Sequence, residues 1–249
     1  MANETGDMKL LGNFRKLIDR VKNEPDYKPS NAAITAAAME VKYAAGLAVV
    51  QELTTHQATS KLAVSDREAL FDSLKPLMTR VHNLVKASGA PASVIEDLSS
   101  FKRKLVGASK SSKAKPDAAA GDAKPGTGAN APAKTRSSAQ TSYENQIGHL
   151  NGYLAVLQNI SGYNPNEADL KLAALQTLRD TLQAKNDAVS AASVLVSQAR
   201  GRRDELLYTG EDSIVNTALL AKNYVLAAFG RSSQIYKDLA GLSFKRAQK

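Results

Sequence analysis

The chain has 249 residues, a net charge of +9 and no cysteine, so disulfides, thiolate metal ligands and cysteine nucleophiles are excluded. Hydrophobic residues make up 43% of the sequence and tryptophan is absent, so a core must be built mainly from Ala, Leu, Val and Ile. The N-terminal residues are polar and acidic, unlike a secretory signal, and the most apolar stretch, 32–50, is interrupted by Glu40 and Lys42. We therefore expect a cytoplasmic protein without a transmembrane helix.

The first fifty residues carry the apolar periodicity of α-helices. Apolar residues in 10–21 recur every three or four positions and predict a first helix, which ends before Pro25 and Pro29. Ser30 or Asn31 can cap a second, alanine-rich helix, because a short polar side chain satisfies free backbone N–H groups at a helix start.

The next segment leaves two readings open. Ser65 and Glu68 have the spacing of a capping box, so a third helix can begin there, or one helix can run through. Pro76 falls inside the following apolar stripe and is expected to kink or interrupt it. Gly89 is expected to stop that helix, and Pro91 to start a short fourth one.

Residues 107–138 consist largely of Lys, Ala, Pro, Gly, Ser and Thr. Such a segment offers almost no apolar surface to offset the entropy lost on ordering, so we expect a flexible tether. Over 104–138 there are seven Lys and Arg against two Asp, so much of the net charge lies here.

After the tether the helical pattern returns. Apolar residues in 147–157 predict a helix that ends by Gly162, and Asn166 is expected to cap a long helix reaching Leu206. Residues 209–212 predict a turn, and Gly230 is expected to separate two last helices. Since no stretch shows the alternation of a strand, we predict an all-α fold.

The second half repeats landmarks of the first. Tyr27-Lys28-Pro29 recurs as Tyr163-Asn164-Pro165, and Ser100-Phe101-Lys102-Arg103 recurs as Ser243-Phe244-Lys245-Arg246. The offset in residue number between paired landmarks grows in one direction along the chain, as expected for two copies that differ by small insertions. We therefore predict a tandem duplication, with helical bundles of about four helices in 1–106 and 139–249 joined by the linker 107–138.

No pattern of catalytic or metal-binding residues stands out. Glu52 and His56 lie four positions apart and share a helix face, but they lack the second Glu and His of a metal site in a helical bundle. His82 and His149 are isolated, and Gly121 and Gly126 are followed by threonine where a phosphate-binding loop requires lysine. We expect no enzyme activity, no metal and no cofactor.

Two groups of residues remain as candidate contacts. A basic linker can attract phosphate through counterion release, although it lacks aromatic residues for base stacking. Its cationic side chains are Lys110, Lys113, Lys115, Lys124, Lys134 and Arg136. The repeated ends can either pack on their own bundles or contact a partner, and they comprise Phe101, Lys102, Arg103, Phe244, Lys245 and Arg246.

The second half resembles a group of uncharacterised cytoplasmic helical-repeat proteins of Bacteroidetes bacteria. The resemblance rests on residues 162–167, 182–186, 224–230 and 236–245, with weaker similarity in 14–103. It implies an all-helical fold and no catalytic residues.

The sequence as a whole predicts a non-catalytic structural or interaction protein, a scaffold or adaptor that uses two similar helical modules. A protein partner or self-assembly is expected, and no membrane contact. The alternative is a nucleic-acid-associated protein that binds phosphate through the basic linker.

Overall fold

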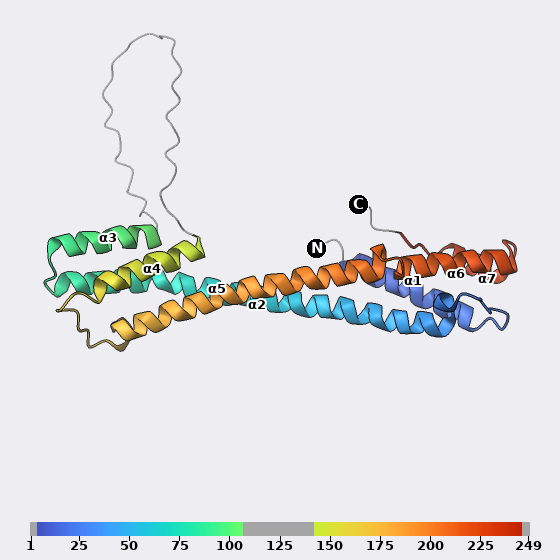
Figure 1. Ribbon diagram of the computed structural model, residues 1–249, viewed down its shortest axis with the longest axis horizontal. Helices are drawn as coiled ribbons and strands as arrows, with labels where there is room; N and C mark the ends of the chain where they lie inside the picture. The colour runs from blue at the N-terminus through green and yellow to red at the C-terminus, as the bar shows by residue number, and fades with distance from the viewer. Residues whose placement is uncertain (1–3, 107–141, 246–249) are drawn as a thin grey trace, which may run out of the picture. The chain divides into compact units, whose positions relative to one another are not determined.

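A computed structural model of the chain describes residues 4–106 and 142–245 (Figure 1). All regular structure in these two ranges is helical and neither contains a strand, which confirms the all-α prediction. The helices are α1 (Glu4–Lys22), α2 (Ala36–Ala87), α3 (Ala92–Val106), α4 (Tyr143–Leu157), α5 (Leu172–Asp204), α6 (Ile214–Phe229) and α7 (Gln234–Ala240). Among them, none is both long and apolar enough to cross a membrane.

The helix α2 runs unbroken for 52 residues, through both Ser65 and Pro76. Proline lacks an N–H group, so the helix loses one backbone hydrogen bond at Pro76. The expected interruption is nevertheless absent, because Leu74 and Met78 on either side are fully buried and tertiary packing holds the helix together. Thr35 caps the start of α2 by accepting a hydrogen bond from the N–H of Ala38 at 3.3 Å.

The described residues form two compact units. Among them, unit 1 comprises residues 4–62 with 190–245, and unit 2 comprises residues 63–106 with 142–189. This division differs from the predicted bundles 1–106 and 139–249, because α2 and α5 each contribute residues to both units. Each unit therefore contains helices from both halves of the sequence.

The core of unit 1 forms where α1 packs against α6 and α7. The apolar stripe of α1, with Leu11, Phe14 and Ile18, is fully buried there. Gly46 of α2 makes a close approach possible, since an added methyl group would lie 2.7 Å from Leu11 and Ile214. The buried residues of this core include Leu10, Leu17, Val21, Tyr27, Ile34, Met39, Leu207, Val215, Ala218, Ala221, Val225, Ile235, Leu239 and Phe244.

The core of unit 2 forms around α3 and α4, which lie side by side (Figure 1). Gly152 of α4 lets the ring of Phe101 in α3 approach its backbone, where an added methyl group would be 2.3 Å from a ring atom. The buried residues of this core are Phe71, Leu74, Met78, Val81, Val85, Leu98, Leu105, Ile147, Leu150, Tyr153, Leu154, Leu157, Leu170, Leu175 and Leu182.

The same turn precedes α2 and α5. The hydroxyl of Tyr27 donates to the carbonyl of Ile34 at 2.7 Å, and that of Tyr163 donates to the carbonyl of Leu170 at 2.6 Å. Each carbonyl ends a short 3-10 turn, η1 (Ala32–Ile34) or η2 (Ala168–Leu170). Asn31 caps the turn η1 and not the long helix, whose start is capped by Thr35, so the cap predicted for α2 at Ser30 or Asn31 is wrong. The turn η2 begins after Glu167 without a side-chain cap, so the predicted cap at Asn166 is wrong.

Buried residues of the two halves recur at constant offsets in residue number. With the offset that relates Tyr27 to Tyr163, buried Leu11, Phe14, Leu17, Ile18 and Val21 of α1 match buried Ile147, Leu150, Tyr153, Leu154 and Leu157 of α4. With a slightly larger offset, buried Leu74, Met78, Val81 and Val85 of α2 match buried Ile214, Ala218, Ala221 and Val225 of α6. Gly89 and Gly230, which follow these two helices, both have positive φ, 75° and 78°. We call residues related by these offsets corresponding positions.

Candidate functional site

None of the six predicted linker contacts can be placed. The six cationic residues Lys110, Lys113, Lys115, Lys124, Lys134 and Arg136, together with Arg246, lie outside the described residues. The remaining predicted contacts, Phe101, Lys102, Arg103, Phe244 and Lys245, are described below.

Both phenylalanines of the repeated ends pack against their own units. Phe101 is half-buried against Gly152, and Phe244 is 8% exposed and belongs to the core of unit 1. A lysine ammonium lies 6.0 Å from each ring, from Lys104 at Phe101 and from Lys222 at Phe244. The two rings therefore occupy similar environments, in which an aromatic face is covered by a cationic side chain.

The cationic neighbours of these rings differ in exposure. Arg103 and Lys245 are exposed, whereas Lys102 is half-buried. Burial, together with the nearby charge of Lys86, lowers the pKa of Lys102. Neither Lys86 nor Lys102 forms an ion pair within the part of the chain that the structure describes.

Glu52 and His56 lie on one face of α2, as their spacing predicts. His56 Nε2 is 3.6 Å from Glu52, and the same carboxylate binds the guanidinium of Arg202 in α5. The hydrogen bond from Arg202 lowers the pKa of Glu52. Across the described ranges, no group of three or more His, Asp or Glu side chains is placed to hold a metal ion.

His82 is a buried polar contact between three helices of unit 2. Its Nε2 lies 3.1 Å from the hydroxyl of Ser99 in α3, and its Nδ1 lies 3.5 Å from the hydroxyl of Tyr153 in α4. Ser99 donates its own proton to the carbonyl of Ile95, so it accepts from Nε2 of His82. The serine proton is thus committed to the backbone, which favours a packing role over a nucleophilic one.

His149 of α4 lies half-buried in the same unit. Its Nε2 is buried without a hydrogen-bond partner among the described residues. Burial, and then the charge of Lys104, lower its pKa, which keeps the ring neutral.

The most deeply buried charge in unit 1 is Asp7 of α1, at 2% exposure. Its carboxylate accepts a hydrogen bond from Arg203 at 3.2 Å and one from the hydroxyl of Tyr208 at 2.5 Å. Arg203 also donates to the neighbouring Asp204 at 2.6 Å. Burial and the adjacent carboxylate of Asp7 raise the pKa of Tyr208, so its proton stays in this network.

One pocket of unit 1 lies at the junction of α5 and α6. It has a volume of about 390 Å³ and is lined by Val49, Arg202, Glu205, Leu206, Gly210, Glu211 and Asp212. Three carboxylates and two aliphatic side chains line it, and its one guanidinium is bound to Glu52. Of the three carboxylates, that of Asp212 contacts the ammonium of Lys42, which leaves Glu205 and Glu211 as the acidic side chains of the lining without an ion pair among the described residues.

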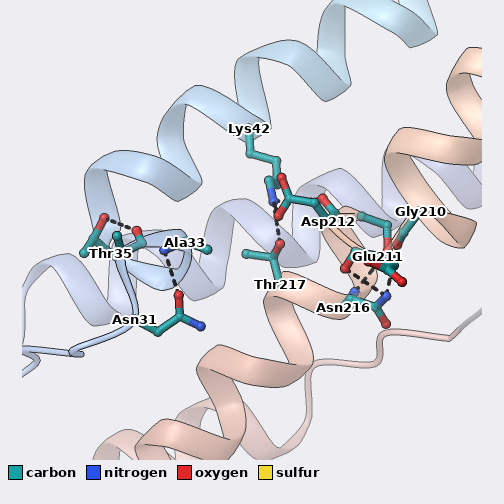
Figure 2. Close-up of polar contacts among 11 residues, drawn as sticks. Asn31, Ala33, Thr35, Lys42, Gly210, Glu211, Asp212, Asn216 and Thr217 are labelled. Carbon is teal, nitrogen blue, oxygen red and sulfur yellow. Dashed lines mark hydrogen bonds and ion pairs between the residues drawn. The ribbon is translucent and has the colours of Figure 1, made fainter.

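Lys42 fixes the turn beside this pocket (Figure 2). Its ammonium, on a side chain only 11% exposed, donates to the carbonyl of Asp212 and to the hydroxyl of Thr217, both at 2.8 Å. The ammonium also contacts the Asp212 carboxylate. All three lysine donors are thus satisfied by the turn and by the first residues of α6, so Lys42 acts as a structural pin.

The turn begins with a π-helical segment, η3 (Glu205–Thr209). The N–H of Gly210 donates to the carbonyl of Glu205 at 2.9 Å, and a methyl group at Gly210 would lie 2.8 Å from that oxygen. The side-chain amide of Asn216 then bonds the carbonyls of Gly210 and Glu211 at 3.0 and 3.2 Å (Figure 2). Single π-helical turns inside helices often accompany functional sites.

Sequence reasoning predicted the turn at 209–212 but missed its pocket and the role of Lys42. The sequence contains a signal for an irregularity at this point. The offset in residue number is 136 between Arg67 and Arg203 but 140 between Asp72 and Asp212. The segment 203–212 is thus four residues longer than 67–72, and it contains η3 and the turn where α2 continues as a helix over 67–72.

Comparison with known proteins returns no matching family model, no matching curated protein and no matching solved structure. The resemblance stated from the sequence therefore stays a prediction.

Proposed function

We propose that the protein is a non-catalytic interaction protein, a scaffold or adaptor built from two copies of one helical repeat. The observation that carries the proposal is the contrast between matched interiors and different exteriors. Corresponding buried positions keep apolar residues, as in Leu11 with Ile147 and Leu74 with Ile214. The identical hydrogen bonds of Tyr27 and Tyr163 further support a common ancestry of the two halves.

The exposed surface has diverged where the interior has not. Met8, Val41 and Leu220 of unit 1 are 54%, 73% and 47% exposed. Their corresponding positions in unit 2 hold exposed Glu144, Thr177 and Arg80. A fold that keeps its core while changing its surface is suited to binding different partners through its two units, and the pocket beside η3 gives unit 1 a second distinguishing feature.

The test exchanges these surfaces in the full chain. The variant Met8→Glu, Val41→Thr, Leu220→Arg places in unit 1 the residues that unit 2 already carries at corresponding positions, so we expect the fold to be kept. Affinity capture with chemical crosslinking from native cell extract, quantified by mass spectrometry, should show a set of proteins bound by wild type and reduced at least tenfold with the variant.

The matched control is Glu144→Met, Thr177→Val, Arg80→Leu, which should leave that set bound. Circular dichroism and thermal unfolding verify that both variants fold. If both variants and wild type capture the same proteins equally, these exposed positions have no role in binding, and the proposal loses its main support.

A second candidate function is nucleic-acid binding through the linker. It is favoured by the run of cations where α3 leads into residues 107–141, since half-buried Lys102 and exposed Arg103 and Lys104 follow one another there. Cations at a helix C-terminus also stabilise the helix dipole, which is the simpler explanation.

A gel shift across a salt series separates these explanations. Phosphate contacts must weaken steeply as salt rises, because binding releases counterions. Deletion of 107–138 should abolish a salt-dependent shift, and Lys102→Gln with Arg103→Gln should reduce its salt slope. A wild-type chain that gives no shift at low salt excludes this candidate.

A further inference from the structure

The two halves of the sequence, 4–106 and 142–245, are interlocked in both compact units. In unit 1, α1 and the first part of α2 come from the first half, and the end of α5, α6 and α7 come from the second. In unit 2, the rest of α2 and α3 pack with α4 and the start of α5. Neither core is completed by one half alone.

Polar contacts between the halves occur in both units. In unit 1, Arg20 binds Asp238 at 2.8 Å, in addition to the pairs formed by Asp7 with Arg203 and Lys42 with Asp212. In unit 2, Lys185 binds Asp66 at 2.7 Å, the Arg67 guanidinium donates to Asn186 at 3.1 Å, and Arg80 pairs with Asp169 at 2.5 Å. These contacts fix which helix of one half meets which helix of the other.

One close contact at a glycine in each unit also lies between the halves. Phe101 of the first half lies against Gly152 of the second, and Gly46 of the first half lies against Ile214 of the second. Both sites lack room for a methyl group, so complementarity at these points is that of a protein interior.

We infer that residues 4–106 and 142–245 recognise each other without a covalent connection, and that the surface each presents fits the opposite half of a second copy of this chain. The inference rests on the contacts between the halves and is independent of the proposed function. Cutting the chain within 107–141 removes only the high effective concentration that a covalent connection provides. The buried cores and ion pairs between the halves remain.

The test uses the full chain with a protease recognition sequence placed within 107–141. After complete cleavage, both fragments should co-elute at the volume of the uncut protein at about 10 µM, and keep its helical circular dichroism. Two independent bundles, as predicted from the sequence for 1–106 and 139–249, would instead elute as two smaller species. That result would overturn the inference.

A matched pair of variants identifies the interface. Gly152→Ala inserts a methyl group against Phe101 and should lower the urea concentration at which the cut fragments separate. Gly148→Ala, on the same helix with no atom within 4 Å of the new methyl, should leave it unchanged. Equal behaviour of the two variants would show that the α3–α4 contact does not hold the halves together.

Exchange tests the second copy as partner. Two preparations of cut protein are used. In the first, the C-terminal fragment, containing 142–249, carries an affinity tag, and in the second, the N-terminal fragment, containing 1–106, carries a heavy isotope. The two preparations are mixed, unfolded and refolded together. Capture of the tag should retrieve heavy and light 1–106 fragments in the ratio in which they were mixed. Failure to retrieve the heavy fragment would show that a second copy does not supply the missing half.

Discussion

Units 1 and 2 use corresponding arginines for the same contact, but with different chemistry. Arg203 in unit 1 pairs with the buried carboxylate of Asp7, in the first turn of α1. Arg67 in unit 2 lies over the ring of Tyr143, in the first turn of α4, with its guanidinium carbon 3.9 Å from the ring centre. Asp7 and Tyr143 are themselves corresponding positions, so an ion pair in unit 1 and a cation–π contact in unit 2 join corresponding residues.

The two units differ in secondary structure at η3. Arg67 is followed by uninterrupted helix as far as Ala87, whereas Arg203 is followed by a π-helical segment and a turn. Four additional residues in a continuous helix would rotate the apolar face of α6 by about 40° and move it along the helix axis by about 6 Å. The turn restores the phase, because Ile214, Ala218, Ala221 and Val225 are as buried as their counterparts in α2.

The largest loss of stability is expected from breaking the buried ion pair between Asp7 and Arg203 of unit 1. Asp7→Ala leaves Arg203, whose side chain is 11% exposed, without its partner in α1 and leaves the hydroxyl of Tyr208 without an acceptor. Removing one partner of a buried pair typically costs 3–5 kcal/mol, and Asp204 still binds Arg203, so we expect about 3 kcal/mol in urea unfolding.

Three variants set the scale for that measurement. Asp26→Ala, at an exposed position, should change stability by less than about 0.5 kcal/mol. Tyr143→Leu, at the corresponding contact of unit 2, should cost only about 1 kcal/mol, while Tyr143→Phe keeps the ring and should be neutral. Equal costs for Asp7→Ala and Tyr143→Leu would mean that the two contacts do not differ in the way their chemistry indicates.

The glycines at close contacts provide the next comparison. Gly152→Ala should destabilise unit 2 by about 2 kcal/mol, because the methyl group meets the rigid ring of Phe101 at 2.3 Å. Gly46→Ala in unit 1 meets the flexible ends of Leu11 and Ile214 at 2.7 Å, and alanine favours the helix by up to about 1 kcal/mol, so we expect little net change.

Gly12→Ala and Gly148→Ala have open space at the new methyl group and serve as controls for helix propensity. Chemical denaturation followed by far-ultraviolet circular dichroism measures all four variants. If Gly46→Ala proves as costly as Gly152→Ala, side-chain flexibility does not decide the outcome.

Lys42 tests how firmly the turn of unit 1 is held. Lys42→Met keeps most of the apolar stem but removes the hydrogen bonds to Asp212 and Thr217, so we expect a loss of about 1–2 kcal/mol. Backbone amides of 210–217 should exchange faster with deuterium, while those of the continuous helix near corresponding residues 70–77 should not. Lys9→Met, at an exposed position of α1, is the control, and unchanged exchange at 210–217 would contradict the role of Lys42 as a pin.

Much of the helical architecture could be predicted from the sequence. Periodic apolar residues located α1, α3 and α4, and Gly89 and Gly230 marked helix ends because both adopt positive φ. Local signals failed where tertiary contacts decide. Pro76 does not interrupt α2 because its neighbours are buried, and the Ser65 capping box is inside a helix that already supplies its hydrogen bonds.

Which half packs with which could not be predicted in the same way. The apolar faces of α1 and α4 show that other helices must pack against them. The pattern does not show whether the helices that bury α1 come from the first or the second half of the sequence. The choice depends on specific pairs such as Arg20 with Asp238 and Phe101 with Gly152, which are far apart in sequence and have no local signature. For the same reason the pocket beside η3, which requires α2 and α5 together, was missed.

The smallest expected effect is a pH dependence confined to unit 2. Burial, with the charges of Lys102 in α3 and Lys86 in α2, lowers the pKa of His82 below its usual value of 6.5, while Tyr153 of α4 contacts it only as a neutral hydroxyl. As pH falls, the histidine therefore binds a proton in the unfolded chain before it does so in the folded chain. Its contribution to the free energy of unfolding is fully present above about pH 7 and is lost as pH drops through the usual histidine range. Burial, with the charge of Lys104, lowers the pKa of His149 as well.

We expect the unfolding midpoint of wild type to fall between pH 7.5 and 5.5, and to fall less for His82→Gln and for His149→Gln. Carboxylates with lowered pKa, such as Glu40 and Asp238 in unit 1, lose their stabilising charge only at more acidic pH, so this window isolates the histidines. A wild-type midpoint that stays constant over the window would show that protons bind His82 equally well in the folded and unfolded chain, and that its burial between α2, α3 and α4 is without energetic consequence.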